Sequence, residues 1–155
     1  MKLFKCLLIV ICLGSVLPSG CNRFNPREVY DTVVQPDNIA QIKEQLLKSH
    51  NYARGSVGEL KVSPVLDKYA QEWAESMASR NRMTHGNFID RVQWSGGTTG
   101  ENIAKGTINV DQVMRMWMDS SGHRHNIMKE DFKFVGFGVA ISSNGVVYWC
   151  TDFGG

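Results

Sequence analysis

Histidine side chains, together with one glutamate in a glycine-rich segment, are the groups of this sequence best suited to chemistry. The four histidines are His50, His85, His123 and His125. Imidazole nitrogens combined with the Glu101 carboxylate suit a borderline metal such as zinc, and the same groups suit general acid–base catalysis. His123 and His125 lie one residue apart in GHRHNIM, a spacing that separates side chains on a helix but can bring them together in a turn or a strand. The spacing alone leaves open a metal site, a catalytic dyad or a polar turn.

Other common catalytic motifs do not occur in the sequence. It contains no H-E-x-x-H, no paired C-x-x-C, no G-x-S-x-G and no phosphate-binding P-loop. Cys150 stands between Trp149 and Thr151 in a strand-like segment, with no partner evident from the sequence. A cysteine nucleophile is therefore not favoured.

Each candidate residue also has a structural interpretation. His50 falls on the first predicted helix, where a hydrogen-bonded structural role is favoured, and His125 is best explained as an exposed or packing residue. Glu101 follows Gly100 and could serve only as a cap or as a loop anchor that accepts backbone N–H bonds. Spacing alone does not establish a functional cluster of histidine and glutamate.

The length and composition are those of one globular domain preceded by a targeting segment. The chain has 155 residues, of which 43% are hydrophobic and 21% charged. Residues 1–20 read MKLFKCLLIVICLGSVLPSG, in which two lysines precede a short apolar run and small residues follow it. This is the pattern of a secretory signal peptide, and the apolar run is shorter than the about 20 residues of a membrane-spanning helix. We therefore expect an exported protein: extracellular, periplasmic or anchored at the cell surface.

Removal of the predicted signal peptide makes the chain neutral. The full sequence has 17 Lys+Arg and 15 Asp+Glu, and the loss of Lys2 and Lys5 leaves 15 of each sign. A neutral domain without a basic tract argues against nucleic acid as the main partner and removes the electrostatic reason to dock on an anionic membrane. The remaining predicted route to a membrane is a lipid anchor.

Cys21 is the candidate for that anchor. It follows LPSG directly after the apolar run, which resembles the lipidation signal of bacterial lipoproteins, although Leu17 lies one position too far upstream. The alternative is a disulfide between Cys21 and Cys150, as an oxidising compartment permits, and a free, buried Cys150 is also acceptable. We place lipidation first and leave the others open.

Hydrophobic periodicity predicts helices followed by a C-terminal hairpin. One helix begins after Asp37 as cap, a second lies within residues 62–83 with Ser63 as cap, and a third spans residues 110–119 with Asn109 as cap. Residues 83–106 are glycine-rich and predicted to be loop. The segments FVGFGVAI and VVYWCTDF flank Asn144–Gly145, which favours a tight hairpin. This order predicts a single α+β domain at residues 37–155, after an N-terminal arm at residues 21–36, with helices covering an antiparallel sheet.

Five segments, in order, resemble the CAP superfamily, also called the SCP domain. This superfamily includes cysteine-rich secretory proteins, antigen-5 proteins and pathogenesis-related class 1 proteins. The five segments are LLKSHNYAR, LDKYAQEWAESMASRNRMTHG, GENIAKG, VMRMWMDSSGHRHNIM and VGFGVAISSNGVVYWCTDFG. The resemblance covers residues 39–155, points to a bacterial-type member, and implies an α-β-α sandwich with a central antiparallel sheet.

The resemblance also implies a site. In this family two histidines and two glutamates line a cavity that can bind zinc or another divalent ion. Position by position, the first histidine falls on His85, the first glutamate on Glu101 and the second histidine on His123, whereas His125 is not a family ligand. The second glutamate falls on Ser120, so this sequence lacks one carboxylate of the tetrad.

Two functions follow as hypotheses. The first is a binding module without turnover, whose cleft holds His85, Glu101, His123 and Ser120 and takes a small-molecule, lipid, glycan or peptide ligand. The second is a zinc-assisted, peptidase-like hydrolase with His85 and His123 as metal ligands and Glu101 as a third ligand or as the catalytic base. The missing carboxylate and the lack of a nucleophile favour the binding module.

Overall fold

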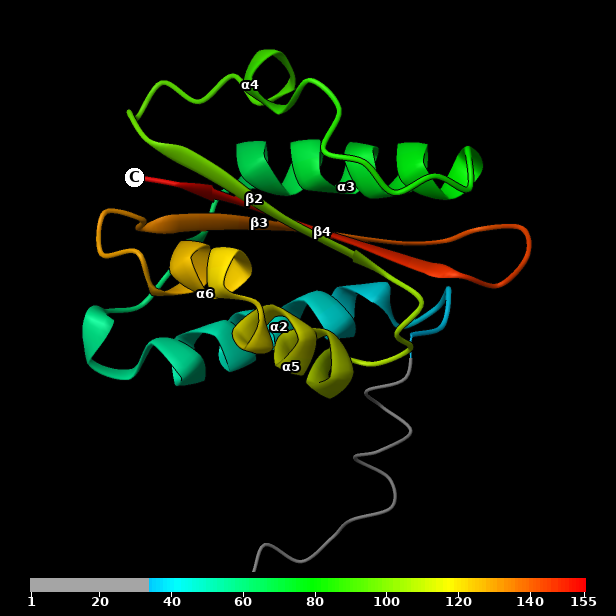
Figure 1. Cartoon of the computed structure of the whole chain (residues 1–155), viewed down its shortest axis with the longest axis horizontal. Helices are drawn as coiled ribbons and strands as arrows, with labels where there is room; N and C mark the ends of the chain where they lie inside the picture. Colours follow the sequence, from blue (N-terminus) through cyan, green and yellow to red (C-terminus); the bar gives the residue numbers. More distant parts are fainter. Residues whose placement is uncertain (1–33) are drawn as a thin grey trace, which may run out of the picture.

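A four-stranded sheet lies between two layers of helices (Figure 1). The computed structural model describes residues 34–155, so the predicted signal peptide, Cys21 and most of the N-terminal arm lie outside the described residues. The elements are, in chain order, α2 (Ile39–Arg54), the 3-10 turn η1 (Gly55–Val57), β1 (Lys61–Val62), α3 (Pro64–Ser79), α4 (Phe88–Arg91), β2 (Thr99–Lys105), α5 (Val110–Asp119), α6 (Ser121–Met128), β3 (Phe134–Ile141) and β4 (Val147–Gly154). No helix within residues 34–155 combines the length and apolar character needed to cross a membrane.

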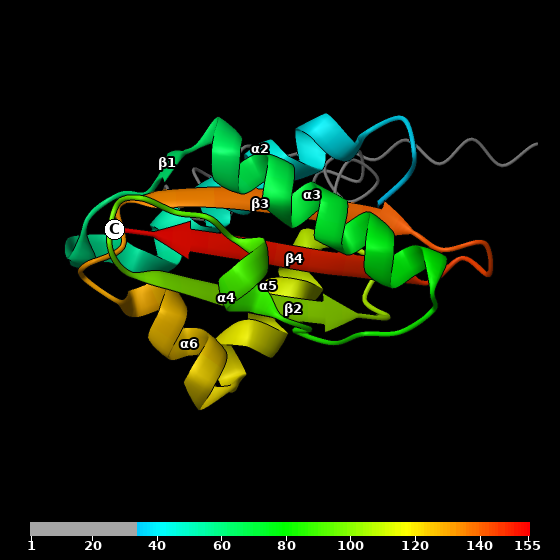
Figure 2. The same ribbon diagram turned by 90° about the horizontal axis from the view of Figure 1, so that it is seen from above.

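The sheet has the order β1-β3-β4-β2. β4 lies between β3 and β2 and pairs antiparallel with both, which confirms the predicted hairpin and the α-β-α class. The short β1 adds a parallel pair at the β3 edge, a feature that the sequence pattern did not predict. α3 and α4 cover one face, whereas α2, α5 and α6 cover the other, and Figure 2 shows α3 crossing β3 and β4 from above.

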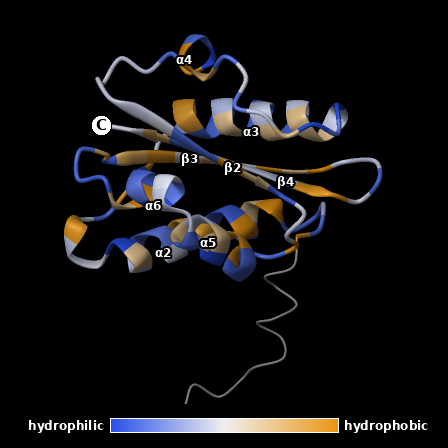
Figure 3. Ribbon diagram, viewed as in Figure 1, coloured by the Kyte–Doolittle hydropathy of each residue, from blue (hydrophilic) through white to orange (hydrophobic). Residues whose placement is uncertain are grey.

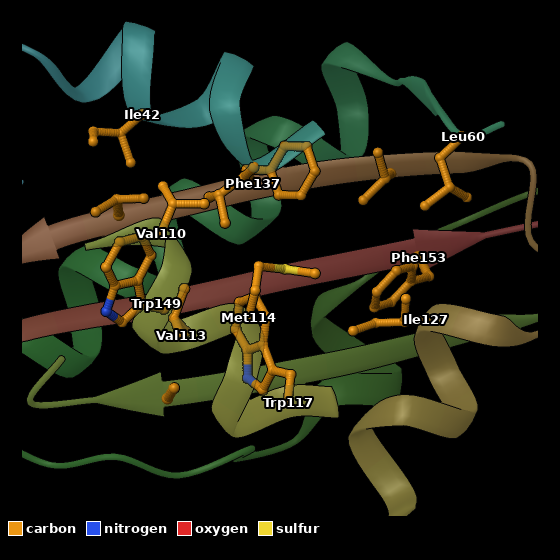
Figure 4. Packing of buried hydrophobic residues seen from close by; sticks show 14 of the residues in the cluster. Ile42, Leu60, Val110, Val113, Met114, Trp117, Ile127, Phe137, Trp149 and Phe153 are labelled. Atoms are coloured by element: carbon orange, nitrogen blue, oxygen red, sulfur yellow. The ribbon is translucent and has the colours of Figure 1, made fainter. Parts of the chain in front are cut away.

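Most of the apolar core lies on the face covered by α2, α5 and α6 (Figure 4). Trp117 of α5 and Trp149 of β4 are fully buried there, and each indole N–H donates to a backbone carbonyl, at 3.4 Å to Ile103 and 3.1 Å to Thr107. Figure 3 shows hydrophobic colour along β3 and β4, hydrophilic colour on part of β2, and both colours on the helices. This amphipathic pattern drives the three layers together.

The opposite face is thinner because α3 approaches β3 very closely. A Cβ atom at Gly138 would lie 1.9 Å from the carbonyl oxygen of Ala70, and one at Gly136 would lie 2.0 Å from the carbonyl carbon of Leu66. Only glycine fits at such a contact between a helix backbone and a strand. The small core on this face includes the side chain of Cys150.

Local signals predicted several boundaries correctly. Ser63 accepts a bond from Leu66 N–H and Asn109 accepts one from Gln112 N–H, as the capping patterns indicated. Asp37 is not the cap of α2, because the helix begins at Ile39 after Asn38, whose side chain makes no capping bond to the helix.

Two segments differ from the prediction. The expected loop at residues 83–106 contains α4 and the seven-residue strand β2, whose polar residues hide its strand character from periodicity. GHRHNIM is not a polar turn but lies in α6, and Ile127 within it is buried.

Candidate functional site

Glu101 is the centre of a buried polar cluster at the β2 side of the sheet. Its side chain is 1% exposed, although it lies on an edge strand. Glu101 and Asp152 are directly opposite each other on β2 and β4, and Cys150 is two residues before Asp152. Because side chains two apart share a face, Glu101, Cys150 and Asp152 all face α3 and α4.

His85 reaches Glu101 from the loop after α3. The His85 Nδ1 atom lies 2.8 Å from Glu101 Oε1, while the imidazole itself is 56% exposed. The loop is held against α3 because the Trp73 indole donates to the Thr84 carbonyl at 2.9 Å. The structure therefore brings two of the predicted site residues into direct contact, with the imidazole open to solvent and the carboxylate buried.

Arg91, at the end of α4, holds the other side of Glu101. Its Nη2 donates to Glu101 Oε2, and its Nη1 lies 3.5 Å from Asp152 Oδ2. The guanidinium also stacks over the Trp73 ring, 4.4 Å from the ring centroid. Sequence reasoning missed Arg91 because α4 has only four residues and carries no periodic signal.

The two carboxylates would repel each other if both were ionised. Burial, and then the negative charge of Glu101, raise the pKa of Asp152 to about 7, although the positive charge of Arg91 and a hydrogen bond from Cys150 act in the opposite direction. Near neutral pH the Asp152 carboxyl is therefore protonated for part of the time.

Cys150 is a free, buried thiol that faces both carboxylates. Its Sγ lies 3.3 Å from Glu101 Oε2 and 3.5 Å from Asp152 Oδ1. Burial, followed by the charges of Asp152 and Glu101, raises the pKa of Cys150 well above its usual value. The thiol is protonated at neutral pH, which agrees with the prediction that it is not a nucleophile.

His123 lies on α6, which is fastened to the outer edge of β2. Asn126 donates to the Glu101 carbonyl at 3.1 Å and to Asn102 Oδ1 at 2.9 Å, while Asn102 donates to the His123 carbonyl at 3.0 Å. These bonds satisfy a sheet edge that would otherwise be open. Asn102 thus positions the helix that carries His123, a role that the sequence did not reveal.

The pKa of His123 is lowered from its ordinary value. The main cause is burial, followed by the charge of His85. Within residues 34–155, however, the compact group of three metal-binding donors is Glu101, Cys150 and Asp152, whose ligand atoms lie within 4.8 Å of one another. His123 is not part of that group.

Ser120 and His125 have peripheral positions. Ser120 lies between α5 and α6, and its carbonyl accepts the Arg124 N–H at 2.9 Å, so its visible role is to begin α6. His125 is exposed, two residues from His123 on the same helix. The helical geometry separates these two histidines, as the spacing argument required.

His50 has the structural role that was favoured. It is fully buried, its Nδ1 lies 2.7 Å from the Leu46 carbonyl oxygen, and its ring contacts Trp117, Phe137 and Phe153. Burial lowers its pKa to about 4, so the ring is neutral at physiological pH. Because His50 lies in the main core under α2, its imidazole is not accessible to a ligand.

A groove lies beside the cluster. It has a volume of about 640 Å³ and is formed by the chain between α4 and β2, with Ile89, Val92, Gln93, Trp94, Ser95, Gly97 and Thr99 as lining residues. A smaller hollow of about 250 Å³ adjoins the His85 loop through Thr84 and Gly86. The predicted cleft residues do not line the groove, although it adjoins Arg91 and the start of β2.

The α-β-α sandwich agrees with the fold expected for the CAP superfamily. The chain belongs to this family: the model described as the Cysteine-rich secretory protein family matches residues 47–153. YkwD of Bacillus subtilis, an uncharacterized protein, is 29% identical over 132 residues, which are 79% of this chain and 50% of YkwD. This chain therefore matches about half the length of that relative.

Two solved structures show the same fold. An outer surface protein from Borrelia burgdorferi aligns with a TM-score of 0.64 and 18% identity, covering 79% of this chain and 96% of that one. An extracellular protein containing a SCP domain from Bacillus anthracis aligns with a TM-score of 0.59 and 21% identity, covering 77% and 43%. At these identities the comparison bears on the fold.

Proposed function

We propose that the protein is an exported CAP-domain binding module whose ligand contacts the solvent-exposed His85 and the groove next to α4, without turnover. Export is supported by the predicted signal peptide and by relatives described as an extracellular and an outer surface protein. The groove of about 640 Å³ has the size of small-molecule sites in proteins. Its mixture of Trp94 and Ile89 with polar residues suits a lipid, glycan or peptide.

The engagement of Glu101 is the observation that favours binding over catalysis. Oε1 accepts from His85, and Oε2 faces both Arg91 and the Cys150 thiol. A general base must reach the proton it removes, whereas this carboxylate is 1% exposed and has both oxygens occupied. Glu101 therefore orients His85 and does not act as the base.

Ligand class is tested by binding with one probe for each chemistry. We suggest laurate, an N-acetylglucosamine oligomer and a random hexapeptide library, each followed by amide chemical-shift changes of the protein. One class should shift residues 84–99 and should bind at least tenfold more weakly to His85→Ala, with His125→Ala as the matched exposed-histidine control. Binding that is equally weakened by both variants, or that shifts only residues far from α4, would contradict the proposed site.

A zinc-assisted hydrolase is the second candidate, and the geometry of His85 favours it in one respect. The Glu101 carboxylate contacts Nδ1 of His85 and leaves its Nε2 free, an arrangement that commonly orients metal-bound histidines. The lowered pKa of His123 keeps that ring neutral, as zinc requires, and the two imidazoles would hold the ion while Glu101 orients the His85 ring. Bound zinc would supply Lewis acidity and an acidified water.

Peptide turnover separates the two candidates. The binding module predicts no cleavage of the hexapeptide library with or without added zinc. Zinc-dependent cleavage that His85→Ala and His123→Ala abolish would establish the hydrolase instead. Cleavage that survives both substitutions would show that neither histidine is catalytic.

A further inference from the structure

Three metal-binding groups, two carboxylates and one thiol, meet beneath α3 and α4. The Glu101 carboxylate, the Cys150 thiol and the Asp152 carboxylate each present a donor atom within 4.8 Å of the other two, and all three residues are buried. Zinc in proteins is bound by these same donors, thiolate and carboxylate oxygen, with an open position filled by water. The group lies on the inner side of Glu101, away from the exposed His85 imidazole.

One carboxylate oxygen of this cluster is incompletely satisfied. The Asp152 side chain has no exposure, and its Oδ2 accepts no hydrogen bond, although it forms an ion pair with Arg91 Nη1 at 3.5 Å. Buried polar atoms are nearly always paired, so a buried acceptor without a hydrogen bond, next to two further metal-binding donors, points to a place for a cation.

The charge balance favours a cation over an anion. Two carboxylates face one guanidinium, so the cluster is either negative or must keep a proton on one carboxyl. A divalent ion bound to two carboxylates and a thiolate, with Arg91 beside it, forms a neutral assembly. Neutral assemblies cost least when buried.

We propose that Glu101, Cys150 and Asp152 form an inner binding site for a thiophilic divalent cation such as zinc or cadmium. On binding, the Cys150 S–H bond breaks, the sulfur donates its electron pair to the metal, and the proton leaves to solvent; no oxidation or reduction occurs. Arg91 gives up its contact with Glu101 and stays over the Trp73 ring. The metal enters past the Arg91 side chain, which is 16% exposed.

The inner site does not depend on the proposed function, although both use Glu101. A histidine-bound zinc would require His123, which the inner site does not use. Cys150 and Asp152 belong only to the inner site. Substitutions of these residues therefore separate the two ideas.

Cadmium titration of the full chain tests the inner site, because a cadmium–thiolate bond gives an ultraviolet charge-transfer band. Cys6, Cys12 and Cys21 are replaced by serine so that Cys150 is the remaining thiol. The band should saturate at one cadmium per chain, with one proton or more released into weakly buffered solution. Zinc should compete for the same site.

Variants identify the ligands. Cys150→Ala should remove the band, and Asp152→Asn should weaken cadmium binding by about 10- to 100-fold. His125→Ala is the surface control, and circular dichroism confirms that each variant is folded. A folded protein without the band, or binding that falls with His123→Ala and not with Asp152→Asn, would overturn the proposal.

Discussion

A buried arginine, Arg54, and a half-buried one, Arg91, lie on opposite faces of the sheet, and their surroundings are opposite in kind. Arg54, at the end of α2, is 1% exposed and donates to four backbone carbonyls: Gly58 at 2.6 Å, Ile127 at 2.6 Å, Lys129 at 3.0 Å and Phe132 at 3.1 Å. Each of its three guanidinium nitrogens therefore has a partner. Arg91 instead faces two carboxylates and leaves Nε and Nη1 without hydrogen bonds.

The difference distinguishes an arginine that stabilises the fold, Arg54, from one that belongs to the candidate site, Arg91. Arg54 joins η1, the end of α6 and the segment before β3, and its hydrogen-bond partners are backbone carbonyls, which do not titrate. Arg91 faces Glu101 and Asp152, and the charge of Asp152 changes near neutral pH. Perturbed, incompletely paired charges are typical of functional sites, whereas fully paired ones hold the fold together.

Removal of Arg54 should have the largest effect on stability. Arg54→Met leaves four backbone carbonyls without their donor, and the two that are buried, those of Ile127 and Phe132, cost about 1–3 kcal/mol each when unsatisfied. We expect a total loss of roughly 4 kcal/mol in the free energy of unfolding, measured by urea denaturation and equal at pH 5 and pH 8. Arg82→Met, at an exposed arginine, should change it by less than about 0.5 kcal/mol. Similar losses in the two variants would contradict a structural role for Arg54.

His50 lies on the same side of the sheet as Arg54 and should make the folded state less stable at acidic pH. Its pKa is about 4 in the folded chain against 6.5 for an unperturbed histidine, so between these values the unfolded chain binds a proton that the folded chain does not. Stability is therefore full above pH 6.5 and falls toward pH 4, by on the order of 3 kcal/mol. His50→Gln should flatten the dependence of unfolding free energy on pH over this window. An unchanged slope would mean that other groups control acid unfolding.

The elements that form the fold were easier to predict from the sequence than the site. Ser63 and Asn109 predict the starts of their helices through local capping chemistry, and Asn144–Gly145 predicts the hairpin. Residues 99–105 did not show a strand pattern, because Glu101 and Asn102 place polar side chains where a buried strand normally has apolar ones. Those polar residues are buried because the site and α6 satisfy them.

Contacts in the site depend on register and on loops, which local patterns do not encode. Glu101 meets Asp152 through the pairing of β2 with β4, at a separation of 51 positions along the chain. Arg91 reaches both from a four-residue helix. His85 and Glu101 were placed in one site by the family resemblance, and their spacing alone did not require the 2.8 Å contact.

Removal of Arg91 should destabilise the chain less than removal of Arg54, and with a pH dependence. A carboxyl whose folded pKa is raised favours the folded state at low pH, and this contribution is lost as pH rises from about 4 through about 7. Arg91→Met removes an attraction that lowers the pKa of Asp152, so the ionised cluster becomes harder to bury. We expect roughly 1–2 kcal/mol more loss at pH 8 than at pH 5 by urea denaturation. A pH-independent loss would place Arg91 in the same class as Arg54.

The smallest expected effect concerns the two histidines of GHRHNIM. His123 is half-buried on α6, its carbonyl is held by Asn102, and the charge of His85 lowers its pKa after burial does, whereas His125 is exposed two residues further along the helix. By calorimetric titration with zinc, any histidine-dependent affinity should fall at least tenfold in His123→Ala and stay within about twofold in His125→Ala. A large loss with His125→Ala would mean that α6 presents the opposite face to the ligand, because a helix cannot direct residues two apart to one ion.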